Sequence, residues 1–219
     1  MYSVRMFFEK VGSARYISHL DLMRCFERVM RRASIPMWYT EGFNPRPFLS
    51  FAVPLSLGTA GLREAVDFRL LEEMPFDEIK ERINVCMPEG LRVLEVTEPV
   101  NKITAIEASR YNIKLVPDSI APSELHSAMA SFFRQESIVI KKLNKKKKEV
   151  EVDIRPHIKE YLFEHVEDGV MLHITLSSGC NENCNPSLVI DALASHCGDG
   201  ITSAIEREKL MIAQLADFC

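Results

Sequence analysis

The sequence lacks the long apolar segments and the glycine-rich motifs that mark several large classes of protein. Among its 219 residues, no apolar run approaches the roughly 20 residues that cross a bilayer. The N-terminal segment MYSVRMFFEK has no basic start followed by a long apolar stretch, so we expect no secretory signal. Neither GxGxxG nor a Walker pattern occurs, which argues against the standard phosphate-binding loops. The composition, 47% hydrophobic and 26% charged, is that of a soluble globular protein, which we expect in the cytoplasm without a membrane partner.

The six cysteines are too few to form a disulfide framework in a chain of this length. The segment CNENCNPS resembles the CxxxCxxC motif that binds the iron–sulfur cluster of radical SAM enzymes, but Ser187 replaces its third cysteine. A zinc site made of Cys180, Cys184, His196 and Cys197 is conceivable, although adjacent His and Cys ligands are an unusual spacing. Free thiols are the simpler interpretation, and we expect neither a metal nor another cofactor.

The net charge of −4 conceals an uneven distribution. Residues 1–69 carry ten Lys and Arg against six Asp and Glu, whereas residues 70–219 carry seventeen against twenty-five. A basic first third on an acidic remainder indicates a localised anion-binding face, and uneven solvation explains the same pattern equally well.

Periodicity in the first hundred residues predicts a domain in which strands and helices alternate. Residues 2–10 alternate around Val4, Met6 and Phe8, with Phe7 on the other face, as in a strand. The elements expected after it are a helix at 18–33, a short strand at 37–40, a long loop at 41–63, a strand at 65–71, a helix from 75 to the break at 88–90 and a strand at 91–96. This βαββαβ order is that of a ferredoxin-like unit.

The second half repeats this order loosely, which predicts an α+β protein of two tandem ferredoxin-like units at residues 1–100 and 107–219. The expected elements are strands at 110–116, 137–143, 150–154, 161–166 and 170–176, and helices at 122–133 and 186–196. The strands at 137–143 and 150–154 make an inserted hairpin. Its lysines, between 141 and 148, indicate a solvated turn or a salt-sensitive nucleic-acid contact. The last segment, 204–212, fits either a closing strand or a helix.

The helix expected at residues 18–33 has an apolar stripe and a basic face. Ser18 is a good N-cap, and Asp21 completes a variant capping box. The apolar stripe consists of Leu20, Met23, Phe26, Val29, Met30 and Ala33. The basic face consists of Arg24, Arg28, Arg31 and Arg32. This face is either ordinary solvated helix surface or a contact for phosphates, because the planar arginine fork suits bidentate binding.

The loop Gly42–Pro47, with the sequence GFNPRP, is the strongest local signal. Asn44 and Arg46 each precede a proline, which favours extended backbone at both positions. A stiff loop that carries an arginine, an asparagine and Phe43 suits base stacking and phosphate contact with single-stranded RNA. The alternative is a loop that closes over the sheet and buries its aromatic side chains.

His19 is the candidate for proton transfer. At a helix start its cationic form is disfavoured, so we expect a neutral imidazole that either packs structurally or accepts a proton. His19 and Asp21 are two residues apart and point in different directions. Glu64 and Asp67 lie three apart in a strand, face opposite sides of the sheet and do not form an acid–base pair.

Four segments of the first half resemble the radical-SAM-linked protein family. They are YISHL at 16–20, GFNPRP at 42–47, SFAVPLSLG at 50–58 and EAVD at 64–67. Members of that bacterial family stand alone or are joined to the C-terminal end of a radical SAM enzyme with a cobalamin-binding region. The resemblance implies a radical SAM enzyme as partner and names no reaction.

Three functions are compatible with these patterns. We favour a non-catalytic accessory module that presents RNA or another anionic substrate to a radical SAM enzyme. The residues expected to bind it are Arg24, Arg28, Arg32, Phe43, Asn44 and Arg46. One alternative is an RNA-processing or RNA-modifying enzyme, in which His19 is the general base and Arg46 stabilises a phosphate transition state. The other is a protein–protein adaptor without nucleic-acid binding.

Overall fold

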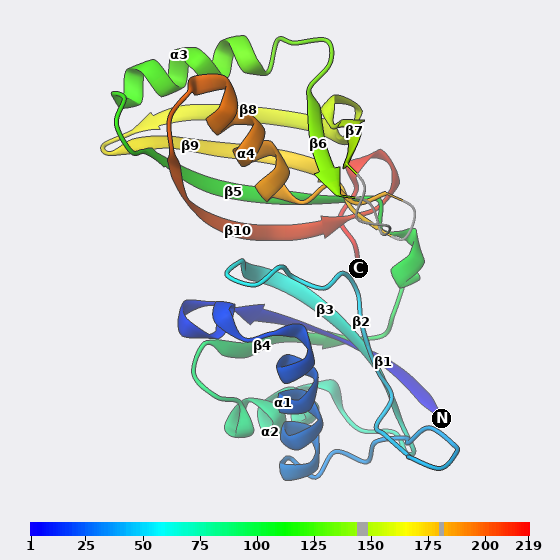
Figure 1. Cartoon of the computed structure of the whole chain (residues 1–219). Helices are drawn as coiled ribbons and strands as arrows, with labels where there is room; N and C mark the ends of the chain where they lie inside the picture. The colour runs from blue at the N-terminus through cyan, green and yellow to red at the C-terminus, as the bar shows by residue number, and fades with distance from the viewer. Residues whose placement is uncertain (144–148, 180–181) are drawn as a thin grey trace. The chain divides into compact units, whose positions relative to one another are not determined.

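The computed structural model describes residues 1–143, 149–179 and 182–219, which form two compact units. Unit 1 comprises Met1–Ile106 and Arg207–Cys219, and unit 2 comprises Glu107–Glu206. Each unit combines an antiparallel sheet with two long helices (Figure 1). The mixed α+β class expected from the sequence is confirmed. None of the helices in the described part of the chain is long and apolar enough to span a membrane.

Unit 1 is built on a sheet with the strand order β4-β1-β3-β10, and the short β2 also pairs with β3. Its elements are β1 (Tyr2–Lys10), α1 (His19–Arg32), β2 (Leu49–Phe51), β3 (Ala60–Leu70), α2 (Phe76–Cys86), β4 (Leu91–Thr97) and the end of β10 (Ile201–Met211). Short 3₁₀ turns lie at Gly12–Tyr16, Ile103–Ala105 and Ala213–Leu215.

Strand β1 is buried on both faces, so its side chains pack into two different apolar clusters. Val4, Met6 and Phe8 belong to the main core of the unit, together with apolar residues of α1 and α2. Phe7 belongs to a second cluster that includes Phe218 of the C-terminal tail. The alternation predicted for this strand is therefore confirmed, but neither face is left to solvent.

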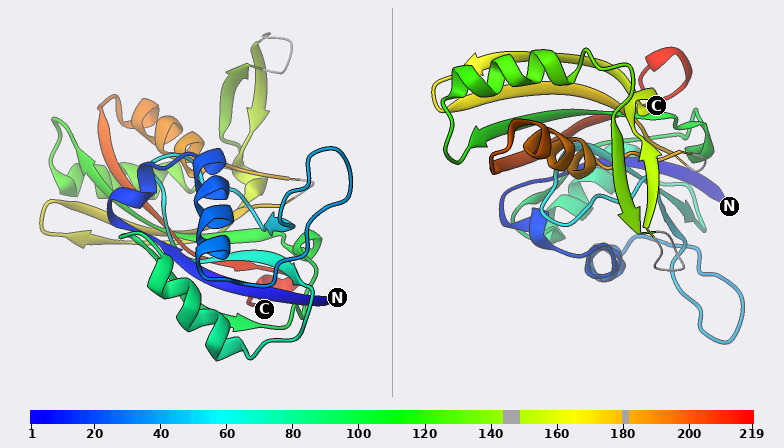
Figure 2. Two further views of the ribbon diagram at one scale, coloured as in Figure 1. Left: turned by 90° about the horizontal axis from the view of Figure 1, so that it is seen from below. Right: turned by 45° about the horizontal axis from the view of Figure 1, so that its top comes forward.

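Unit 2 has the strand order β10-β5-β9-β8 and a separate two-stranded hairpin. Its elements are β5 (Ala108–Pro117), α3 (Pro122–Phe132), β6 (Val139–Leu143), β7 (Glu149–Asp153), a 3₁₀ turn (Arg155–His157), β8 (Ile158–Val166), β9 (Gly169–Ser177) and α4 (Pro186–Cys197). The inserted hairpin predicted from the sequence is confirmed as β6 and β7 (Figure 2). Part of its lysine run, residues 144–148, lies outside the described residues.

Several details of the prediction differ from the structure. Leu20 is 64% exposed, and Leu22 is buried in its place. Two residues along a helix turn the side chain through about 200°, so Leu20 faces away from the stripe of Leu22, Phe26 and Met30. The segment expected as a strand at 37–40 forms only isolated bridges, one of them Met37 with Leu70.

The loop expected at 41–63 contains β2 and the start of β3, because β3 extends to Ala60. The ambiguous segment at 204–212 is part of a strand, β10. Residues 207–219, which the sequence placed in the second domain, group instead with unit 1. Their contacts to β1 and to the segment before Ile106 bring them there.

Candidate functional site

The N-terminus of α1 has the cap that the sequence predicted. The backbone N–H of Asp21 donates to Ser18 Oγ at 3.2 Å, and this hydroxyl donates to Asp21 Oδ2 at 2.7 Å. Arg24 Nη1 lies 3.1 Å from Asp21 Oδ1 and forms an ion pair with it. The hydrogen bond from Ser18, and then that from Arg24, lower the pKa of Asp21. Arg24 is thus neutralised locally and is the weakest member of the basic face.

Arg28, Arg31 and Arg32 are exposed along α1. Within the described residues, no carboxylate lies within ion-pair distance of any of the three. Arg31 and Arg32 lie in the last turn, where the helix dipole favours cations. Arg28, in the middle of the helix, has no such local explanation.

The GFNPRP loop forms an arm, residues 39–47, that projects from unit 1 (light blue in Figure 2). Its base is a narrow ladder in which Thr40 N–H donates to Arg46 O at 2.9 Å and Phe48 N–H donates to Trp38 O at 3.0 Å. Arg46 N–H also donates to Thr40 Oγ1 at 3.2 Å. Phe43 at the tip is fully exposed (107%), and Asn44 and the Arg46 side chain are exposed as well. The arm therefore holds its aromatic tip out in water.

A cation–aromatic stack supports the base of the arm. The Arg69 guanidinium carbon lies 4.4 Å from the centre of the Phe48 ring and 5.4 Å from that of the Trp38 indole. The two rings are 6.0 Å apart. Such stacking stabilises the base by about 0.5–1 kcal/mol per contact at an exposed site. Trp38 and Phe48 thus fix the arm, whereas Phe43 has no packing role.

A small cavity lies within unit 1, between α1 and the strands. Its lining combines apolar side chains with three titratable ones: Phe8, Lys10, His19, Leu22, Phe51, Val53, Pro54, Leu55, Glu64 and Ala65. Its interior of ≈ 10 Å³ has room for the centre of one water molecule. Lys10 reaches it because it continues the face of β1 that carries Met6 and Phe8.

Lys10 is buried, with only 1% of its surface exposed. Its Nζ donates to Ile17 O at 3.0 Å and to Arg15 O at 3.4 Å. No carboxylate of the described residues forms an ion pair with it. Burial lowers the pKa of Lys10, the Glu64 carboxylate opposes this effect, and the Arg207 guanidinium adds to it.

Glu64 is committed to Arg207. Arg207 Nε donates to Glu64 Oε1 at 2.9 Å, and its Nη2 donates to the second carboxylate oxygen and to Val53 O. Both side chains are almost completely buried. Gly61 makes room for this pair, since a Cβ there would lie 2.5 Å from Glu64 Oε1.

His19, the predicted proton-transfer candidate, lines the same cavity from the start of α1. Its ring packs edge-on against Phe51, with the ring centres 5.3 Å apart. Burial, and then the nearby Lys10 ammonium, lower the pKa of His19. Both effects favour the neutral imidazole, and burial, not the position at the helix start, is the main cause. Arg46 is not among the residues that line the cavity with His19.

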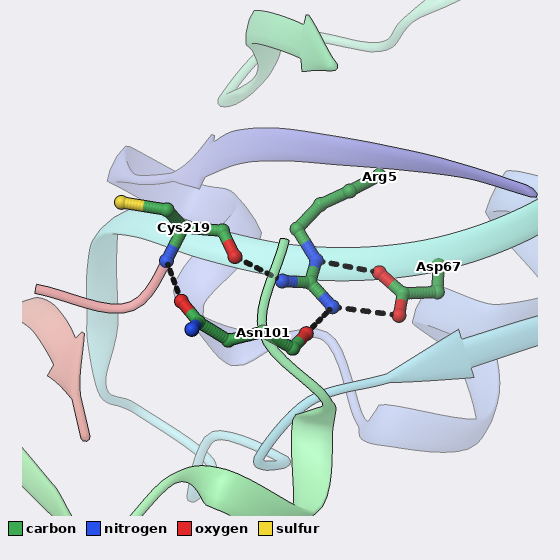
Figure 3. A network of polar contacts seen from close by, with 4 residues as sticks. All are labelled: Arg5, Asp67, Asn101 and Cys219. Atoms are coloured by element: carbon green, nitrogen blue, oxygen red, sulfur yellow. Dashed lines mark hydrogen bonds and ion pairs between the residues drawn. The ribbon is translucent and has the colours of Figure 1, made fainter. Parts of the chain in front are cut away.

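A second buried cation ties the C-terminal tail to unit 1 (Figure 3). Arg5 Nε and Nη2 donate to the two oxygens of Asp67 at 2.7 and 2.8 Å. Arg5 also donates to the backbone oxygens of Asn101 and Cys219. Its guanidinium carbon lies 4.1 Å from the centre of the Phe218 ring. Glu64 and Asp67 thus face opposite sides of β3, as predicted, and each pairs with a different buried arginine.

Cys184, His196 and Cys197, the described members of the proposed zinc site, are not assembled into a metal site. His196 Nε2 lies 2.8 Å from Ser131 Oγ, and Cys184 is buried in the core of unit 2, where burial raises the pKa of its thiol to about 11. Burial also raises the pKa of Cys197. No group of three His, Cys, Asp or Glu in the described ranges could hold a metal ion, and Cys180 lies outside these ranges.

Comparison with known proteins gives a family and a fold. A family model described as "Uncharacterized protein conserved in bacteria (DUF2344)" matches residues 3–186. The chain belongs to this family. No curated protein matches the chain.

Among solved structures, a chain from the "Crystal Structure of a Cbf5-Nop10-Gar1 Complex" is similar, with a TM-score of 0.56 and 9% sequence identity. The alignment covers 94% of this chain and 48% of that chain, so this chain spans about half the length of its structural neighbour. At this identity the likeness concerns the fold alone.

Sequence reasoning missed Lys10, Arg5 and Arg207. Each is a cationic residue in a strand. The alternation of residues along a strand does not show which other segment of the chain buries the strand's polar side chains. The signal that was available is the pair of acidic residues in EAVD, because a carboxylate on a covered strand face needs a cationic partner.

Proposed function

We propose that this protein binds single-stranded RNA through the arm and the basic face of α1. The observation that carries the proposal is the fully exposed Phe43 at the tip of a braced arm. Keeping a phenylalanine in water has no benefit for folding, whereas an exposed ring stacks on any nucleobase. Arg46 on the arm and Arg28 on the helix supply cations for the phosphates on either side of such a base.

Fluorescence anisotropy with a labelled single-stranded oligoribonucleotide tests this proposal. Phe43→Ala should weaken binding about tenfold, the loss expected for one stacked base. The double variant Arg28→Ala, Arg32→Ala should weaken binding and lower the slope of log K against log salt by about 0.7 for each lost phosphate contact. Arg134→Ala is the matched control, because Arg134 is an exposed arginine of unit 2. Equal affinity of all four proteins would refute the proposal.

We propose further that the bound RNA is presented to a radical SAM enzyme. The support is the resemblance of residues 16–20, 42–47, 50–58 and 64–67 to radical-SAM-linked proteins. Capture of the tagged protein from a lysate of its source should retain such an enzyme at moderate salt. The Phe43→Ala variant separates the two parts of the proposal, because it weakens RNA binding and should leave a direct protein contact intact.

We also propose that each unit is a ferredoxin-like unit. The strand order β4-β1-β3-β2 in unit 1 supports this assignment.

Two other functions remain as alternatives, and each predicts a different experimental result. An RNA-processing or RNA-modifying enzyme would convert RNA in a way that His19→Ala abolishes. A protein–protein adaptor would hold its partner enzyme after nuclease treatment and would show no RNA affinity above nonspecific levels.

A further inference from the structure

A groove of ≈ 870 Å³ lies in unit 1, between the N-terminal end of β1 and the segment that leads from β3 into α2. This is the size of a ligand pocket, about 300–1,000 Å³. Val4 and Leu70, which belong to the core of the unit, form part of its lining. Met1, Tyr2 and Phe76 also line it and are 67%, 45% and 37% exposed. Large apolar side chains that stay exposed around one groove mark a binding surface.

The groove also contains a strand edge without a partner. β1 pairs with β4 only from Arg5 onward, and within the described ranges Tyr2–Val4 pair with β3 alone. β4 ends at Thr97, and Pro99, which follows it, has no N–H to donate to a neighbouring strand. The side of Tyr2–Val4 that faces away from β3 therefore presents its backbone N–H and C=O groups at the groove. A strand edge of this kind accepts an extended peptide as an added strand.

The charged side chains of the groove are acidic. Glu73 and Glu98 belong to its lining, and both are exposed. Neither forms an ion pair with any residue that the structure describes. Arg69, whose Nη1 lies 3.8 Å from Met1 Sδ, is held in the stack at the base of the arm. The two carboxylates repel the phosphates of RNA and attract the side chains of lysine and arginine.

We propose that this groove binds an extended, cationic and apolar segment of a partner protein. The segment adds as a short strand to the edge of Tyr2–Val4. Its central aliphatic or aromatic side chain enters the groove, and the lysine or arginine residues on either side of it pair with Glu73 and Glu98. The flexible side chains of Met1 and Met74 adapt to the shape of the entering side chain. This inference goes beyond RNA binding and does not depend on it, because the lining includes no residue of the arm or of α1.

Binding of defined peptides to the full chain tests this inference. The probe is the fluorescein-labelled, amidated peptide Lys-Val-Leu-Val-Arg, and its charge-reversed counterpart is Glu-Val-Leu-Val-Glu. At low salt, the double variant Glu73→Lys, Glu98→Lys should bind the cationic peptide about tenfold more weakly than wild type does. The same variant should bind the anionic peptide more tightly than wild type does. The matched control is Glu81→Lys, Glu89→Lys, because both residues are exposed and neither lines the groove.

Two further measurements test the added strand. Methylation of single backbone nitrogens of the probe removes its N–H donors one at a time. Because successive N–H groups of a strand point to opposite sides, methylation should weaken binding at alternate positions only. In amide NMR spectra of the protein, the signals of Tyr2, Ser3 and Val4 should shift most when the probe is added.

Equal affinity of wild type and the double variant for the cationic peptide would overturn the inference, and so would NMR shifts that leave Tyr2–Val4 unchanged. A dimer of the chain that Glu73→Lys, Glu98→Lys abolishes would also overturn it, because the groove would then belong to a second copy. Phe43→Ala separates this inference from the proposed function. It should weaken RNA binding and leave peptide binding unchanged, whereas the groove variant should weaken peptide binding without weakening that of RNA.

Discussion

The two units are built from similar elements, but only unit 1 buries charged side chains among the described residues. Among the described residues, the nearly fully buried charged side chains are Arg5, Lys10, Glu64 and Arg207, and all four belong to unit 1. The buried polar side chains of unit 2 are hydroxyls: Ser109, Thr175, Ser177 and Ser178. Its ion pairs, such as Arg110 with Glu160, lie at the surface.

Burial of a charge costs several kcal/mol per ion, and apolar packing alone gives a stable core more cheaply. Unit 2 shows that this chain can form such a core from a sheet and two helices. Unit 1 therefore differs from unit 2 in its buried cations, its exposed arginines and its aromatic arm, and the proposed RNA binding is assigned to the arm and to α1 of this unit.

The largest effect is expected from breaking the Glu64–Arg207 pair. Arg207→Met leaves the Glu64 carboxylate buried and unpaired, which should lower the free energy of unfolding by about 3–5 kcal/mol. In unit 2, Arg110→Met breaks an ion pair with the exposed Glu160 and should cost below about 1 kcal/mol. Urea titrations measure both. The double variant Glu64→Leu, Arg207→Met should recover most of the loss, and similar losses for both arginines would remove the contrast between the units.

A smaller loss is expected from filling the space beside Glu64. Gly61→Ala places a methyl group 2.5 Å from the carboxylate oxygen, so Glu64 must shift away from Arg207. Strain of this kind costs about 1–3 kcal/mol. Unchanged stability of Gly61→Ala in a urea titration would contradict the tight packing around Glu64.

The sequence predicted what local periodicity controls. Spacing along a single element was enough to predict the cap at Ser18 and the exposed arginines of α1. It also predicted the alternating side chains of β1 and the opposite directions of Glu64 and Asp67. The partners could not be predicted in this way, because Glu64 and Arg207 are 143 positions apart and meet only through the sheet. The exposure of Leu20 could not be predicted either, because it depends on which face of α1 packs against the sheet.

The cavity of unit 1 should also make stability depend on pH. Folding lowers the pKa of His19 from its ordinary value of 6.5, so well above pH 6.5 the ring is neutral in both states and contributes no pH dependence. As the pH falls below 6.5, the unfolded chain binds the proton first and stability is lost. The groups that face His19 in this cavity are Lys10 and Glu64, the latter paired with Arg207.

Thermal unfolding of wild type and His19→Gln between pH 5 and 8 measures this effect. The melting temperature of wild type should fall more steeply toward pH 5 than that of His19→Gln, and the curves should run parallel above pH 7. Parallel curves over the whole range would show that His19 is solvated like an ordinary surface histidine.

The smallest effect on stability is expected at the tip of the arm. Phe43→Ala removes a ring that is fully exposed, so the free energy of unfolding should not change within the error of a urea titration. Phe48→Ala removes a ring of the stack at the base of the arm and should lower stability measurably. A loss at Phe43 as large as that at Phe48 would assign the arm a structural role instead.

The most direct measurement is a map of where RNA touches the chain. A single-stranded oligoribonucleotide containing 4-thiouridine is cross-linked to the protein by ultraviolet light, and the cross-linked peptides are identified by mass spectrometry. The account predicts cross-links in the arm at residues 39–47 and in the peptides of α1, with few in unit 2. Cross-links confined to unit 2, or none at physiological salt, would contradict it.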